Sequence, residues 1–248
     1  MVARSKSCAA CAVRFIALCR VLDLQQLAHL NRHSYGRWYP AGRMIAGVAA
    51  CENWCATVLE GVVKLSKILP DGRQQIVALL FPGDFLGRPF QAEFPYTAEA
   101  ATDVHLCCYS RTSFEGLLRD HPKFKQAFLE RTLDSVDVAR DWMLLLGRKT
   151  AREKVATLLL TIMARSAKPG SERGNVGTEL VLPLTRTEMA DYLGLRLETV
   201  SRQLRQLEAS GAIRRCDVRR ILVLAEEKLA AAAGPPDGSE SLQPSGSL

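Results

Sequence analysis

The sequence has no run of eighteen or more apolar residues, so we expect no membrane-spanning helix. Arg14, Arg20 and several cysteines interrupt the apolar stretch from Ala9 to Leu22, which argues against a signal peptide. The chain also lacks an internal repeat, a nucleotide-binding fingerprint and a recognisable set of catalytic residues, so a redox enzyme is a poor interpretation. These absences favour a cytoplasmic protein that is not an enzyme.

Positive charge and cysteine are what the sequence does contain. Its 248 residues carry 33 Lys and Arg against 26 Asp and Glu, and a net charge of +7 favours polyanionic partners. Arginines crowd the C-terminal third, at Arg186, Arg196, Arg202, Arg205, Arg214, Arg215, Arg219 and Arg220. The eight cysteines are not expected to form disulfides, because the cytosol keeps thiols reduced.

Three cysteines form a C-x2-C-x7-C motif at the N-terminus, made by Cys8, Cys11 and Cys19. Thiolates suit iron–sulfur clusters or zinc, and this spacing alone does not decide between a cluster, structural zinc and unligated thiols. Cys51 and Cys55 could complete the metal site or act as a redox thiol pair. The simpler interpretation is that they are two small residues inside a β-domain. Cys216 is interpreted as incidental.

The residue pattern predicts an α+β fold with a cysteine-rich arm at 1–21 and a β-roll at 22–122. The roll is expected to begin with a short helix from Leu22 to Leu30 and to continue as short strands separated by Pro and Gly turns. A long helix follows at 123–149, a winged helix-turn-helix at 150–226 and a disordered tail at 227–248.

The long helix carries an apolar stripe that predicts a homodimer. Val136, Ala139, Met143 and Leu146 recur at the spacings of three and four residues that a helix–helix seam requires. A core helix is the alternative. The length favours a dimer helix, because one small roll cannot cover so long an apolar face.

The segment from Leu184 to Arg202 has the pattern of a helix-turn-helix that reads DNA. Thr185 is a cap, Gly194 supplies the turn, and a second helix begins at Leu197. Its apolar face is Val200, Leu204 and Leu207, and its opposite face is Glu198, Ser201, Arg202 and Arg205. Arg202 can donate hydrogen bonds to guanine, Glu198 can accept a hydrogen bond from cytosine, and Ser201 can contact thymine or phosphate. The alternative is a helical hairpin with a solvated charged face, and the crowded arginines favour DNA. Residues 214–224 can form a wing.

Roll, long helix and winged head together resemble the CRP/FNR superfamily of transcription regulators. Glu198-Thr-Val-Ser-Arg202 is similar to the E-x-x-S-R signature of the FNR branch. The segments 139–154 and 106–109 resemble the FnrL-type oxygen-responsive regulators most closely. The resemblance implies a jelly roll like that of cyclic-nucleotide-binding domains, a homodimer, an inverted-repeat DNA operator with half-sites similar to TTGAT, and contact with RNA polymerase.

The resemblance also implies a [4Fe-4S] cluster that senses oxygen, with Cys8, Cys11, Cys19 and Cys107 as ligands. Neighbouring strand residues face opposite sides, so only one of Cys107 and Cys108 can reach the site, and the resemblance favours Cys107. The alternative is a CRP-like regulator that responds to a small ligand or to thiol oxidation, without a cluster.

Cyclic nucleotide is not expected as a ligand. The cyclic-nucleotide branch places an Arg-Ser pair against the phosphate, whereas the corresponding stretch here is Phe94-Pro-Tyr-Thr-Ala98. Asp84 stands where that branch has a ribose-binding glutamate, and the motif does not assign the phosphate role to Arg88.

Overall fold

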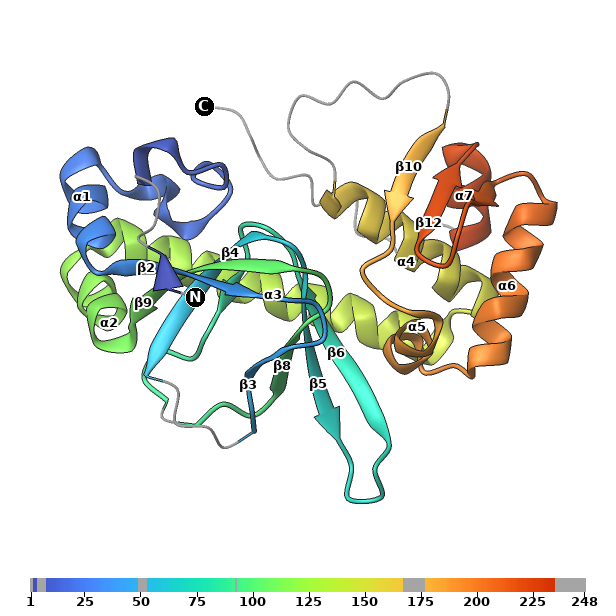
Figure 1. The fold of residues 1–248 in the computed structure, drawn as a ribbon, viewed down its shortest axis with the longest axis horizontal. Helices are drawn as coiled ribbons and strands as arrows, with labels where there is room; N and C mark the ends of the chain where they lie inside the picture. The colour runs from blue at the N-terminus through green and yellow to red at the C-terminus, as the bar shows by residue number, and fades with distance from the viewer. Residues whose placement is uncertain (1, 4–7, 49–52, 92, 167–176, 235–248) are drawn as a thin grey trace. The chain divides into compact units, whose positions relative to one another are not determined.

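The structure is a computed structural model that describes residues 2–3, 8–48, 53–91, 93–166 and 177–234 (Figure 1). The chain divides into two compact units, 1–136 and 137–248, and helix α3 (Pro122–Arg148) continues through the division. Helices and antiparallel sheets confirm the α+β class. Among the described residues, no helix is both long enough and apolar enough to span a bilayer.

Two antiparallel sheets form the roll of the first unit. One sheet has the order β1 (Val2–Ala3), β2 (Ser34–Tyr39), β9 (Val104–Ser110), β4 (Trp54–Glu60) and β7 (Phe85–Leu86). The other has the order β3 (Met44–Ala46), β8 (Thr97–Ala100), β5 (Val63–Ile68) and β6 (Gln74–Leu80). Buried side chains such as Val58, Val63 and Leu106 fill the space between them. Pro70-Asp71-Gly72, one of the expected turns with Pro and Gly, joins β5 to β6.

Helices cover the outer face of the β2–β9–β4 sheet (Figure 1). Helix α1 (Leu24–Arg32) starts two residues after the predicted Leu22, because Asp23 is its cap and Gln26 completes a capping box. Helix α2 (Arg111–Asp120) is capped by Ser110, which places Ser113 in the first turn. Leu27, Leu30, Phe114 and Phe124 form a second core on this face, together with two short 3-10 turns, Cys8–Ala10 and Leu18–Val21.

The second unit contains the end of α3, four further helices and a small sheet. The helices are α4 (Ala151–Ser166), α5 (Arg186–Leu193), α6 (Leu197–Ala209) and α7 (Glu226–Ala233). The sheet has the order β10 (Thr178–Val181), β12 (Arg220–Val223) and β11 (Ile213–Arg215). The β11–β12 hairpin is the wing expected at 214–224.

Helix α7 corrects the prediction of a disordered tail from residue 227. Leu229 and Ala233 are buried, and α7 packs on α4. An alanine-rich composition is typical of a low-complexity tail, but alanine is also the strongest helix former and its small side chain allows close packing. The rest of the predicted tail, 235–248, lies outside the described residues.

Candidate functional site

Cys107 and Cys108 lie on opposite faces of β9. Cys107 joins the outer core beneath the helices, whereas Cys108 is buried between the two sheets of the roll. The cross-strand neighbours of Cys107 are Gly36 on β2 and Thr57 on β4. Strand alternation therefore leaves Cys107 alone of the pair on the face that the arm covers.

Two arm cysteines pack on that same outer core. Cys8 and Cys19 are half-buried beside the cluster that contains Cys107. Cys8 Sγ donates to Asn31 Oδ1 at 3.4 Å, and Cys19 Sγ lies 3.9 Å from the Arg14 carbonyl oxygen. Cys11 is also half-buried, and its amide donates to the Cys8 carbonyl. The structure thus brings the arm and Cys107 to one side of the roll.

Besides burial, neighbouring thiols raise the pKa values of Cys8, Cys19 and Cys107, so these thiols and that of Cys11 lie near one another. Burial, together with charge on Cys8, Cys108 and Cys11, raises the pKa of Cys107 to about 12. Burial likewise raises the pKa of Cys19 to about 11, with added contributions from Cys11 and Cys8. Burial, then Cys11, raises the pKa of Cys8. Buried thiols of this kind lose their protons readily only when a nearby cation compensates the negative charge of the thiolates.

Thiols are donors that both iron–sulfur clusters and zinc accept. No group of three or more Cys, His, Asp or Glu in the described part of the chain is arranged to hold one metal ion. A cubane cluster binds each thiolate on a separate iron, so its ligands stand farther apart than those of one zinc ion. Soft thiol donors suit such a group, and Cys8, Cys19 and Cys107 pack on one core.

The other cysteines lie elsewhere. Cys55 is fully buried on β4, and a Cβ at Gly87 would come within 2.9 Å of its Sγ. Cys216 is exposed in the wing. Cys51 lies outside the described residues, so its predicted role remains a prediction.

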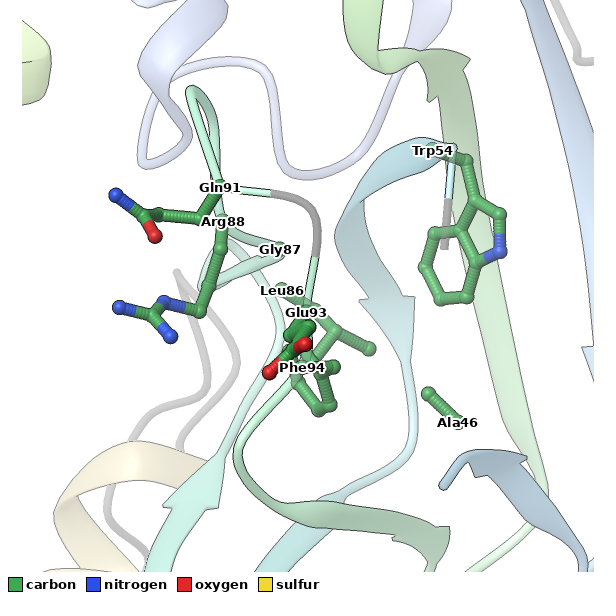
Figure 2. A pocket seen from close by; sticks show the side chains of 8 residues that line it. All are labelled: Ala46, Trp54, Leu86, Gly87, Arg88, Gln91, Glu93 and Phe94. Atoms are coloured by element: carbon green, nitrogen blue, oxygen red, sulfur yellow. The ribbon is translucent and has the colours of Figure 1, made fainter. Parts of the chain in front are cut away.

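A pocket in the roll lies beside Phe94 and Arg88 (Figure 2). Its volume is about 10 Å³, whereas ligand pockets usually measure about 300–1,000 Å³. Arg88 and Gln91 extend away from Trp54 and Ala46 in Figure 2. Asp84, at the ribose-binding position of the cyclic-nucleotide branch, instead binds Arg131 at 2.6 Å. This pocket is therefore much smaller than a typical ligand pocket.

Helix α3 exposes a row of apolar side chains. Val136, Ala139 and Met143 of the predicted seam are exposed, and Met143 is 70% accessible. Leu146 is different: it is half-buried, and a Cβ at Gly194 would lie 3.8 Å from it. Leu129 and Leu133, which the sequence analysis missed, continue the exposed row with the same helical spacing.

The helix-turn-helix has the predicted local structure. Thr185 and Glu188 form a capping box at the start of α5, and Gly194 ends that helix at φ +61°. A side chain at that left-handed position would be strained, so glycine fits the turn. Val200, Leu204 and Leu207 are buried.

The opposite face of α6 is open. Glu198, Arg202 and Arg205 are exposed and Ser201 is half-buried, so the four predicted contact residues share one accessible face. In the described part of the chain, neither Arg202 nor Arg205 has an ion-pair partner, so both guanidinium groups are available to an anion.

Ion pairs that the sequence analysis missed shape the wing. Glu208 of α6 binds Arg215 at 2.6 Å and also accepts the Arg215 amide at 2.9 Å. Asp217 accepts the Arg219 and Arg220 amides and binds the Arg220 guanidinium. The Glu208–Arg215 pair joins two different elements seven residues apart, so it has no periodic signal in the sequence.

Comparisons with known proteins agree with both units. A cyclic nucleotide-binding domain model matches residues 37–121, and a Crp-like helix-turn-helix domain model matches residues 153–232. The transcriptional activator protein FnrL of Cereibacter sphaeroides is 43% identical over 227 residues, or 92% of each chain. The nitrogen fixation regulation protein FixK of Bradyrhizobium diazoefficiens is 37% identical over 83% of this chain and 85% of its own.

A solved structure shares the fold. FixK2 from Bradyrhizobium japonicum superposes with a TM-score of 0.74 and 33% identity, over 82% of this chain and 99% of its own. Roll, long helix and winged head therefore occur together in relatives that regulate transcription, and the chain belongs to the CRP/FNR family of transcription regulators.

Proposed function

We propose that this protein is an oxygen-responsive, homodimeric regulator of the cytoplasm that binds an inverted repeat with TTGAT-like half-sites and contacts RNA polymerase. Cys8, Cys11, Cys19 and Cys107 would hold a [4Fe-4S] cluster. The observation that carries the proposal is the placement of Cys107, rather than Cys108, on the roll face where Cys8 and Cys19 pack.

When bound, the cluster would offer four iron ions to the thiolates, and exposure to dioxygen would break the cluster down. The chain's own residues do the rest. The arm buries Val13, Ala17 and Leu18, and thiolate ligation by Cys107 would add to the folding energy of the arm. A firmly placed arm stabilises the roll beside α3, and paired α3 helices present two α6 helices to DNA at once.

Iron and acid-labile sulfide analysis of protein prepared without oxygen tests the proposal. We expect iron and sulfide in the parent and in Cys108→Ser, and loss of both in Cys107→Ser. A colourless parent that binds the operator would instead support the alternative, a CRP-like regulator that responds to a small ligand or to thiol oxidation. A cluster-loaded Cys107→Ser protein would overturn the ligand assignment.

A further inference from the structure

Two polar side chains outside the cysteine motif border the thiol site. Asn31 lies in the last turn of α1 and Ser34 is the first residue of β2. The Cys8 Sγ to Asn31 Oδ1 distance is 3.4 Å, and Ser34 Oγ donates to the Asn31 carbonyl oxygen at 3.2 Å. The Ser34 hydroxyl also lies near enough to the Cys8 and Cys107 thiols to lower the pKa of each, against the larger effect of burial. One short segment thus lies beside a ligand candidate from the arm and one from the sheet.

Strand register explains why Ser34 can do this. Ser34 pairs with Tyr109 and Gly36 pairs with Cys107, so Ser34 stands diagonally next to Cys107 on the same face of the sheet. Asn31 is half-buried over this face, three residues earlier in the chain. Neither position belongs to the C-x2-C-x7-C motif, and only the fold brings them to the thiols.

We propose that Asn31 and Ser34 are positioning residues that donate hydrogen bonds to the ligand sulfurs of Cys8 and Cys107. The inference rests on the proposed function, because it concerns the loaded site. A thiol can donate, but a ligating thiolate can only accept. Asn31 therefore turns its amide so that Nδ2 faces Cys8, and Ser34 rotates its one proton from the Asn31 carbonyl to sulfur. Both changes are side-chain rotations that leave α1 and β2 in place.

Hydrogen bonds to ligand sulfurs stabilise their negative charge, and they are one of the factors that set the reduction potential of an iron–sulfur centre. Removing a donor should therefore weaken iron retention and lower the potential. Loss of ligand-orienting partners commonly costs about 10–100-fold in metal affinity. A purely structural role would change folding but would leave the potential of the remaining loaded protein unchanged.

The test compares matched variants without oxygen. Asn31→Leu and Ser34→Ala remove the donors, Ser34→Thr keeps the hydroxyl, and Gln25→Leu makes the same amide-to-leucine change on the exposed face of α1. Iron release to a chelator and the reduction potential, measured electrochemically, are the readouts. We expect release about tenfold faster and a lower potential in Asn31→Leu and Ser34→Ala. Ser34→Thr and Gln25→Leu should match the parent.

The outcomes separate the inference from the proposed function. A parent without iron and sulfide would overturn the proposed function itself. A loaded parent whose Asn31→Leu and Ser34→Ala variants release iron at the parental rate and potential would overturn only the inference. If Asn31→Leu does not fold, the comparison of Ser34→Ala with Ser34→Thr decides, because both are small changes at a strand end.

Discussion

Asp84 and Arg131 form an ion pair, with Arg131 Nη2 2.6 Å from Asp84 Oδ1, that joins the turn after β6 to helix α3. The second Asp84 oxygen accepts the Phe81 amide at 2.8 Å, so one carboxylate closes the turn and binds the helix. On the arm side, Ile16 lies so close to Gly83 that a Cβ there would come within 2.9 Å of it. The turn therefore contacts both the cysteine-bearing arm and α3.

Loss of this ion pair should destabilise the first unit. We expect Arg131→Ala to lower the free energy of unfolding by about 1–2 kcal/mol, because the bond is charge-assisted and partly shielded from water. Asp84→Ala should cost more, since the Phe81 amide also loses its acceptor. Urea denaturation measures both. Arg140→Ala is the control, because the Arg140–Asp137 pair is largely exposed. Equal effects of Arg131→Ala and Arg140→Ala would contradict the argument.

Thiol reactivity should report the site in metal-free protein. At pH 8 we expect iodoacetamide to modify exposed Cys216 rapidly and Cys107 slowly, because burial raises the pKa of Cys107 to about 12 and leaves it protonated. The unfolded chain releases such protons from an ordinary pKa of 9.0, so stability of the metal-free protein should fall as pH rises from about 9 towards 12. Peptide mass spectrometry measures the modification. Rapid labelling of Cys107 in folded protein would show that the arm does not cover it.

Base reading should depend on Arg202. Arg202→Ala is expected to lose about 1–3 kcal/mol of binding free energy and to relax the preference at one guanine per half-site. Arg205→Ala should weaken binding to all sequences alike and reduce the salt slope by about one. Competition with operator variants measures both effects. If Arg202→Ala discriminates among operators as the parent does, α6 does not read the bases as proposed.

Two neighbouring wing arginines should behave differently. Arg214 has no ion-pair partner in the described part of the chain, whereas Arg215 is bound by Glu208. We therefore expect Arg214→Ala to lower the salt slope of DNA binding by about one, as a lost phosphate contact would. Arg215→Ala should weaken binding mainly by loosening the wing from α6, and Glu208→Gln should reproduce part of that loss. Identical salt slopes for Arg214→Ala and the parent would remove Arg214 from the interface.

Dimerisation should fail when the α3 face carries a buried charge. Ala139→Asp would place two unpaired carboxylates together in a seam between copies, at a cost of several kcal/mol. We expect this variant to keep its iron without oxygen, to sediment as a monomer and to lose operator binding. Asp134→Lys, on the opposite side of the same helix, is a charge control. A dimeric, DNA-binding Ala139→Asp protein would place the interface elsewhere.

Elements with a local or periodic signal could be predicted from the sequence. Thr185 and Glu188 form the capping box that begins α5, Gly194 ends it, and the apolar spacing of Val200, Leu204 and Leu207 predicts the buried face of α6. Strand alternation likewise predicts that Cys107 and Cys108 face opposite sides. Each of these features depends on residues a few positions apart, so the pattern is visible in a single sequence.

Contacts between distant segments could not be predicted in this way. Asp84 and Arg131 are far apart in the chain, and their pairing depends on where α3 crosses the roll. Asn31 reaches Cys8 only because α1 and the arm fold onto one face of the sheet. Helix α7 was missed for a different reason: its alanine-rich composition resembles a flexible tail until α4 provides a surface on which to bury Leu229.

The end of α3 packs against α5, the first helix of the helix-turn-helix. Trp142 stacks on Tyr192 with ring centroids 4.1 Å apart, and Leu146 lies next to Gly194. In a dimer built on α3, the separation of the two reading helices is then fixed by how the two α3 helices cross. One inserted base pair between half-sites rotates them by roughly 35° about the duplex, given its 10–10.5 base pairs per turn. A head held in this way would not follow that rotation, so for the proposed dimer we expect spacer length, as well as half-site sequence, to decide which promoters are bound.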